Sequence, residues 1–91
     1  MAKRILKYEL DIRLGEVWMP ATAEVKFVGT QGSKVYLWAE VDDQDAPILR
    51  SLRIFGTGHP LPNSLGAYIG TVQQDLPSGQ FVWHIYEPGD E

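Results

Sequence analysis

The residues of this chain that could do chemistry gather near its middle, in residues 53–60, which read Arg-Ile-Phe-Gly-Thr-Gly-His-Pro. Gly56 and Gly58 can adopt positive φ without a steric penalty, and successive backbone N–H groups in such a loop can form a concavity that binds anions. Arg53 and His59 flank the glycines, and Thr57 adds a hydroxyl. The stretch therefore predicts a candidate site for an anionic group.

A purely structural interpretation of the same stretch remains open. A Gly-x-Gly sequence is common where a strand ends and the chain turns, and Pro60 and Pro62 would hold the exit extended. The spacing also fails both nucleotide fingerprints, because the third glycine of a dinucleotide turn is missing and no Gly-Lys-Ser/Thr follows. The sequence alone does not decide between a turn and an anion site.

Histidine chemistry is sparse in this chain. His59 and His84 are the only groups expected to titrate near neutral pH, and neither lies in a motif with a nucleophile or a carboxylate. A metal site would require both histidines and a carboxylate to converge without any local spacing to support it. We therefore expect no catalytic residue, no metal and no cofactor; a small enzyme centred on His59 is the third and least favoured interpretation.

Composition limits the other classes of function. The chain has 91 residues, no cysteine, and a net charge of −4 from 12 acidic and 8 basic residues. This charge has the wrong sign for binding a nucleic acid polymer, and no apolar stretch approaches the ~20 residues that span a bilayer. The absence of cysteine excludes disulfides and favours the cytoplasm. We expect a single domain over residues 1–91 with a modest core, which self-association into a homo-oligomer would help to stabilise.

Alternating apolar and polar residues predict seven short strands, which indicates an all-β antiparallel domain, either a small barrel or a sandwich of about six to seven strands. The runs are residues 4–10 with an extension to residue 12, 16–19, 23–28, 34–42, 49–55, 67–73 and 81–86. We favour a partly open barrel, because closure removes strand edges that invite aggregation. In residues 23–28 the alternation places Phe27 inward. Residues 63–66 are expected to form one helical turn, and residues 87–91 a frayed acidic tail.

The clearest strand, residues 34–42, places two aromatic side chains on the face away from the core, Tyr36 and Trp38. A second layer, a neighbouring subunit or a flat ligand would each cover them. If this strand pairs symmetrically with residues 49–55, Arg53 and Phe55 lie beside Tyr36 and Trp38. A guanidinium beside aromatic rings binds flat or anionic groups, although it is also a common structural contact.

Several segments resemble a family of short uncharacterised proteins from phage and prophage genomes, and the Phe-Gly-Thr-Gly-His-Pro run is the most specific of them. The other segments are residues 3–9, 37–39, 68–72 and 82–87. The resemblance implies a viral setting in a bacterial host cytoplasm, and it brings no established activity. Small phage proteins of this kind are often stoichiometric inhibitors, which is an argument by association.

In that setting the first interpretation is a non-enzymatic sponge that sequesters a host nucleotide or another anionic signal and so counters host defence. The residues that would hold such a ligand are Arg53, Phe55, Gly56, Thr57, Gly58, His59, Tyr36 and Trp38. The alternative is a protein–protein interaction module that inhibits a host protein or joins a virion assembly, with Tyr36, Trp38 and Tyr86 as aromatic anchors.

Overall fold

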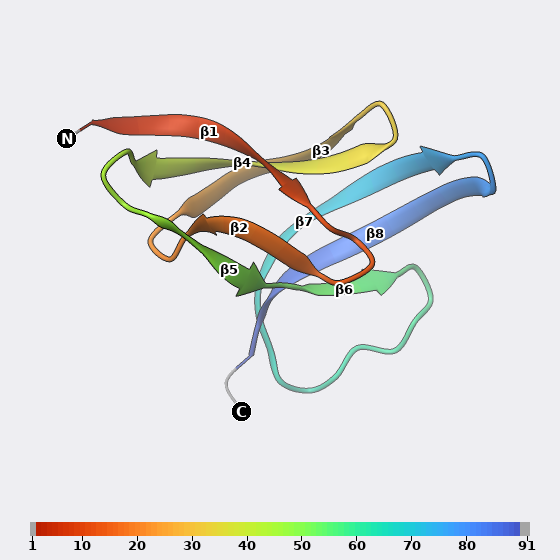
Figure 1. Cartoon of the computed structure of the whole chain (residues 1–91). Coiled ribbons are helices and arrows are strands. Elements are labelled where there is room, and N and C mark those ends of the chain that lie inside the picture. Colours follow the sequence, from red (N-terminus) through yellow and green to blue (C-terminus); the bar gives the residue numbers. More distant parts are fainter. Residues whose placement is uncertain (1, 90–91) are drawn as a thin grey trace.

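The computed structural model describes residues 2–89, which form eight β-strands and no helix (Figure 1). The strands are β1 (Lys3–Leu10), β2 (Glu16–Pro20), β3 (Glu24–Gln31), β4 (Lys34–Asp42), β5 (Pro47–Ser51), β6 (Arg53–Gly56), β7 (Leu65–Leu76) and β8 (Gly79–Pro88). They form three antiparallel sheets: sheet A in the order β1-β4-β3, sheet B of β2 and β5, and sheet C in the order β6-β8-β7. The all-β prediction is confirmed. Since the described residues hold no helix, none of them belongs to a helix able to cross a membrane.

Strand β4 gives sheet A its apolar face, as the alternation predicts. Val35, Leu37, Ala39 and Val41 of this strand are buried, and Leu37 has no exposed surface. Sheets B and C add Met19 and Ile85, among others, to the same core cluster. A single core therefore lies between the inner faces of all three sheets, which fits a sandwich.

No closed barrel forms among residues 2–89, and the strands number eight because the predicted run 49–55 is two strands. The break falls at Leu52, whose N–H donates to the Gly15 carbonyl oxygen at 2.7 Å instead of to a strand. Before this residue β5 pairs with β2, and after it β6 pairs with β8. Gly15 has φ 68°, and a Cβ there would lie 2.7 Å from the Leu52 carbonyl oxygen, so this approach requires glycine.

The prediction that Phe27 faces the core is wrong because β3 contains a bulge. Val25 pairs with Ala39, but Phe27 pairs with the next residue of β4, Trp38, which leaves Lys26 as an extra residue. One extra residue reverses the alternation that follows it. Phe27 is consequently 62% exposed on the outer face, and Val28 takes its place in the core.

Two predictions about the C-terminal third are also corrected. Residues 63–66 contain no helical turn, because β7 already begins at Leu65 and pairs there with Pro88. The tail does not begin at residue 87, since β8 extends to Pro88 and the Glu87 carboxylate accepts a hydrogen bond from Arg50 at 3.2 Å. Asp90 and Glu91, the rest of the predicted tail, lie outside the described residues.

Arg50 connects three separate segments beneath sheet B. Its guanidinium donates to the carbonyl oxygens of Pro20 at 3.1 Å and Ala23 at 3.2 Å, as well as to Glu87. The side chain is only 16% exposed, and its charge is balanced by the carboxylate and by backbone oxygens. Arg50 thereby fixes the β2–β3 turn and the end of β8 against β5.

Gln74 of β7 is the buried polar residue of the core region. Its side-chain amide donates to the Ser33 carbonyl oxygen at 2.8 Å, and its amide oxygen accepts from the Trp83 indole N–H at 3.0 Å. The β3–β4 turn of sheet A is thus held to sheet C by a side chain whose donor and acceptor are both satisfied.

The close approach of β7 to β3 predicts a strong effect of Gly70→Ala. A Cβ at Gly70 would overlap Val28 Cγ1. Because overpacking of this kind typically costs 1–3 kcal/mol, we expect the free energy of unfolding to fall by about that amount in a urea titration. Val28→Ala removes the overlapping atom, so the double variant should lose at least about 1 kcal/mol less than the sum of the single losses. Additive losses would contradict the proposed contact.

The ion pair that ties β1 to the β4–β5 loop predicts a titration shift. The Arg4 Nε–H donates to Asp43 at 2.9 Å, and the backbone N–H of Ala2 and the Gln44 amide assist, which holds the pKa of the Asp43 carboxyl below its usual range. A lowered pKa in the folded state stabilises the fold at pH values above the ordinary aspartate range of about 4, and this contribution is lost as the pH falls through the lowered pKa. We expect Arg4→Ala to raise the Asp43 pKa, measured by NMR titration of its carboxyl carbon. Lys26→Ala should leave it unchanged, and the same pKa in Arg4→Ala as in the original chain would disprove the assignment.

Candidate functional site

The Gly56–His59 stretch folds as a β-turn at the end of β6. The His59 N–H donates to the Gly56 carbonyl oxygen at 3.1 Å, and Gly58 has φ 90°. A positive φ at the third residue is the mark of a type II turn, in which glycine is strongly preferred. The His59 ring covers Gly56, where an added Cβ would lie 3.2 Å from His59 Cε1. The structure therefore gives a physical reason for glycine at both positions of the motif.

A hollow of about 250 Å³ opens beside this turn. Its walls are Phe55, Gly56, Thr57, Gly58, His59, Leu61, His84 and Tyr86. The β6–β8 register explains the gathering, because Phe55 pairs with His84 and Arg53 pairs with Tyr86, and paired residues of antiparallel strands share a face. The opposite face of the same strands carries Ile54 and Ile85 into the core. The hollow thus lies on the outer face of sheet C.

Aromatic and cationic groups lie side by side on this face. The Phe55 and Tyr86 rings meet edge to face, with centroids 6.1 Å apart, and the Arg53 guanidinium lies 5.8 Å from the Phe55 centroid. Tyr68 extends the aromatic row, at 5.3 Å from Tyr86. A flat group that enters the hollow would meet ring surface with a positive charge close to it.

Both ring nitrogens of His84 have hydrogen-bond partners in the hollow. Its Nε2 lies 2.8 Å from the Thr57 hydroxyl oxygen, and its Nδ1 lies 3.0 Å from the Thr71 hydroxyl oxygen, which in turn contacts the Tyr68 hydroxyl. A neutral imidazole donates from one nitrogen and accepts at the other, and a hydroxyl can serve either role. The two threonines therefore fix the plane of the ring, so that His84 forms a firm wall and also anchors the turn through Thr57.

A second hollow, of about 460 Å³, lies on the other side of the same turn. Gly56, Thr57 and His59 line both hollows, and the second is completed by residues 80–83 of β8. The Phe81 and Trp83 rings are stacked there, with centroids 5.6 Å apart and planes inclined by 9°. The turn is therefore a ridge between two partly apolar depressions.

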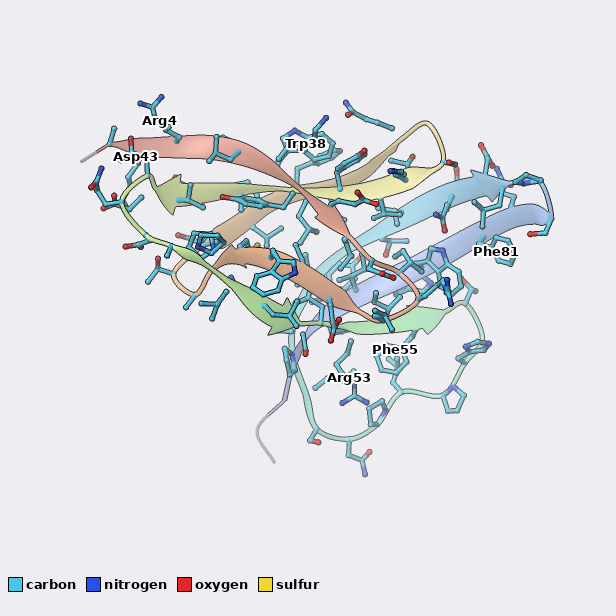
Figure 2. All side chains as sticks on the ribbon, in the orientation of Figure 1. Arg4, Trp38, Asp43, Arg53, Phe55 and Phe81 are labelled. Atoms are coloured by element: carbon cyan, nitrogen blue, oxygen red, sulfur yellow. The ribbon has the colours of Figure 1, made fainter. Side chains whose placement is uncertain are left out.

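The structure gathers six of the eight predicted site residues and separates the other two. Arg53, Phe55 and residues 56–59 lie together, whereas Tyr36 and Trp38 belong to β4 and lie on the outer face of sheet A. Figure 2 shows Trp38 far from Arg53 and Phe55. The proposed pairing of residues 34–42 with 49–55 is wrong, because β4 already pairs with β1 on one side and β3 on the other. Lys7 Nζ lies 4.6 Å from the centroid of the Tyr36 ring instead, and the ring centroids of Trp38 and Phe27 are 5.5 Å apart.

Sequence reasoning missed His84, Tyr86 and the Thr71–Tyr68 pair as parts of the site. The alternation of residues 81–86 does place His84 and Tyr86 together on the outward face of their strand, which is the signal that was present. Alternation does not predict which strand lies beside residues 81–86. The pairing of β6 with β8 brings these side chains to the turn.

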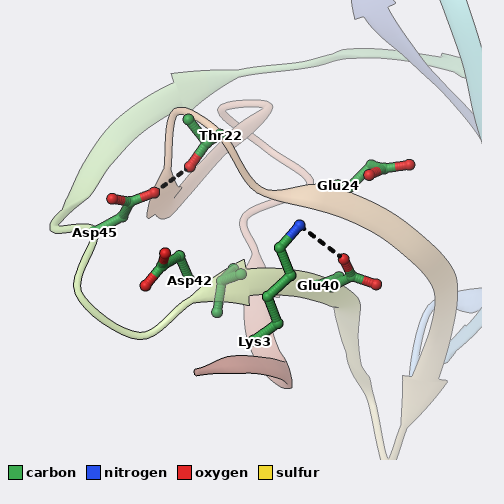
Figure 3. A pocket seen from close by; sticks show the side chains of 7 residues that line it. Lys3, Thr22, Glu24, Glu40, Asp42 and Asp45 are labelled. Atoms are coloured by element: carbon green, nitrogen blue, oxygen red, sulfur yellow. Dashed lines mark hydrogen bonds and ion pairs between the residues drawn. The ribbon is translucent and has the colours of Figure 1, made fainter. Parts of the chain in front are cut away.

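An acidic hollow of about 220 Å³ lies at the far end of sheet A (Figure 3). Glu24, Glu40, Asp42 and Asp45 line it together with Lys3, which pairs with Glu40 at 3.5 Å; Thr22 hydrogen bonds Asp45. Its charge makes it unsuitable for the predicted anionic ligand. Within residues 2–89 no group of three or more histidine or acidic side chains could hold a metal ion.

The type II turn predicts that Gly58 tolerates few substitutions. Alanine at φ 90° is strained, so we expect Gly58→Ala to lower the free energy of unfolding by at least about 1 kcal/mol in a urea titration. Gly58→Asn should cost less, because asparagine adopts positive φ more readily. Equal stability of the alanine variant and the original chain would exclude this turn.

Comparison with known proteins places the chain in a family. A family model described as Domain of unknown function (DUF7352) matches residues 1–91, and the chain therefore belongs to that family. No curated protein and no solved structure matches it significantly.

Proposed function

We propose that this member of the DUF7352 family is a non-enzymatic binding protein that holds a small, flat, anionic ligand of the nucleotide class in the hollow beside the Gly56–His59 turn. The observation that carries the proposal is the convergence of two aromatic rings, two imidazoles and a hydroxyl on one face of sheet C, with a guanidinium next to them. This mixture of ring surface, hydrogen-bonding groups and a guanidinium suits a heterocycle that carries phosphate.

Each group of the hollow has a role in this proposal. Phe55 and Tyr86 present ring surface to a base, and such stacking is worth about 1–3 kcal/mol per base. Arg53 supplies a charge-assisted donor to phosphate oxygens, and the His59 ring adds a hydrogen-bonding nitrogen. His84 does not donate to the ligand, because Thr57 and Thr71 engage both of its nitrogens; it holds the turn in place.

The size of the hollow limits how much of a ligand it encloses. Its volume of about 250 Å³ lies just below the range of about 300–1,000 Å³ that encloses drug-sized molecules. We infer that one portion of the ligand is enclosed and that the rest extends over the turn toward the depression at Phe81 and Trp83. A stoichiometric sponge for a host signal, acting in the cytoplasm of a bacterium infected by phage, is the biological role that we propose.

Binding is favoured over turnover by the chemistry of the lining. No carboxylate is among the described residues that line the hollow, and the His84 nitrogens are engaged by hydroxyls that also position the turn. General acid–base catalysis needs a group that is free to take and return a proton. His59 is exposed, and the lining of the hollow offers it no carboxylate with which to exchange a proton.

Native mass spectrometry of protein purified from bacterial lysate tests the proposal. We expect a discrete extra mass of nucleotide size, released on denaturation. Arg53→Ala and Tyr86→Leu should each lower retention of this mass at least about fivefold, because each removes a contact worth about 1–3 kcal/mol. Trp38→Leu is the matched control, since Trp38 lies on sheet A and its loss should leave retention unchanged.

Three outcomes would reject the proposal. The first is protein without any bound mass that also fails to bind added nucleotides; the second is retention that survives both variants of the hollow. The third is conversion of a nucleotide to product by purified protein, which would favour an enzyme at the same turn. Circular dichroism of each variant ensures that lost retention does not reflect lost folding.

A protein–protein interaction module is the second candidate, and one observation favours it. The bulge in β3 leaves Phe27 62% exposed beside Trp38 and Tyr36, so three aromatic rings lie on the outer face of sheet A. Exposed aromatic clusters often anchor partners. If this face binds a host protein, Phe27→Ser should abolish its capture from host lysate, and Arg53→Ala should have no effect.

A further inference from the structure

Strand β1 is an outer strand of sheet A, with β4 on one side only. In Figure 1 it begins at the upper left, beside the N-terminus, and descends toward the centre of the molecule. Six of its eight residues are exposed, including Ile5 at 53% and Leu6 at 40%. The open side of such a strand offers a row of backbone donors and acceptors to any strand that can pair with it.

The other outer strands carry features that discourage pairing. Strand β3 is bulged at Lys26, β7 has two shifts of register, and β6 has only four residues. In sheet B, β2 ends with Pro20 and β5 begins with Pro47. Bulges, short strands and prolines are the usual means of protecting an edge. Within residues 2–89, β1 alone is an outer strand of eight residues with continuous register and neither proline nor glycine.

The charges along β1 are complementary to those of a second β1 strand placed antiparallel to it. Lys3 and Arg4 precede Leu6, and Glu9 and Asp11 follow it. Two β1 strands placed antiparallel can therefore bring the basic start of each copy beside the acidic end of the other. Lysines often keep an edge free, but in this arrangement Lys3 gains a carboxylate partner.

The register of the pairing follows from the faces and the charges. Even-numbered residues of β1 face the core and odd-numbered residues face outward, so a continuous sheet must pair odd residues with odd residues. A centre at Ile5 would place Lys3 opposite Lys7, and a centre at Lys7 would place that lysine opposite itself. A centre at Leu6 avoids both repulsions. It pairs Lys3 with Glu9 of the second copy, in both directions.

We propose that β1 is the interface of a two-fold symmetric homodimer, in which two β1 strands pair antiparallel about Leu6 and form one six-stranded sheet in the order β3-β4-β1-β1-β4-β3. The intramolecular pairs Lys3–Glu40 at 3.5 Å and Lys34–Glu9 at 3.8 Å lie at the surface, where such pairs contribute little and can exchange; Glu40 is half-buried and the other three side chains are exposed. Leu6 meets Leu6 across the axis on the inner face, and Ile5 is covered by Lys7 of the second copy.

This interface lies on sheet A and is independent of the hollow on sheet C. It would also bring together the exposed aromatic rings of the two copies. The outer face of the combined sheet would carry the Phe27, Trp38 and Tyr36 rings of both copies on one side. A single strand pair buries less area than a standard interface, so we expect an association that depends on concentration in the micromolar range.

Sedimentation velocity over a range of concentrations tests the dimer. The expected species is twice the chain mass of 10.2 kDa. Lys3→Glu and Glu9→Lys should each weaken the dimer at least about tenfold, because each creates two like-charge contacts across the axis. The double variant restores opposite charges and should restore the dimer, whereas Lys26→Glu on β3 should leave it unchanged. A monomer at all concentrations overturns the proposal, as does a dimer indifferent to these variants.

Cysteine cross-linking tests the register, since the chain has no cysteine of its own. Directly opposed residues of antiparallel strands have Cα atoms about 4.5–5.5 Å apart, within the range that a disulfide spans, so Leu6→Cys should oxidise to a covalent dimer. Lys7→Cys should not, because the two copies of residue 7 would lie about 8 Å apart. Cross-linking of Lys7→Cys in preference to Leu6→Cys would overturn the proposed register.

Discussion

A single backbone hydrogen bond, from Leu52 to the Gly15 carbonyl oxygen, decides how the chain divides among its sheets. Residues 47–51 before it pair with β2, residues 53–56 after it pair with β8, and the close contact at Gly15 leaves no room for a side chain. The Phe-Gly-Thr-Gly-His-Pro turn reaches β8 only because of this transfer. The candidate site therefore depends on a contact made by residues that take no part in it.

The rigid part of the site is contributed by β8, which is the central strand of sheet C. Its buried face is fixed by Ile85, and its outer face presents His84 and Tyr86 to the turn. Arg50 secures the end of the strand through Glu87. A loop of glycine and proline thus gains a defined position from packing behind it and from the Thr57–His84 hydrogen bond in front of it. Preorganisation of this kind lowers the entropy that a ligand must overcome.

The sequence predicts those features that depend on local pattern. The alternation of β4 follows from residue types and is found, and of the two glycines that could adopt positive φ, Gly56 and Gly58, only Gly58 does so. The position of Phe27 did not follow, because one extra residue at Lys26 reverses the pattern and nothing in the local sequence marks a bulge. The sequence likewise predicts only part of the candidate site, because local pattern does not specify which strands pair. The residues 53–59 are contiguous, whereas His84 and Tyr86 join them through a strand pairing that alternation cannot specify.

The hydrogen bonds of Gln74 have a consequence for the chemical ageing of the protein. Its amide nitrogen must donate to the Ser33 carbonyl oxygen while its oxygen accepts from Trp83. Deamidation would replace that donor with a carboxylate oxygen and set two acceptors against each other in a buried place. The contact between the β3–β4 turn and sheet C would then open first. In stored samples the contact between sheets A and C would therefore be lost while each sheet was still folded.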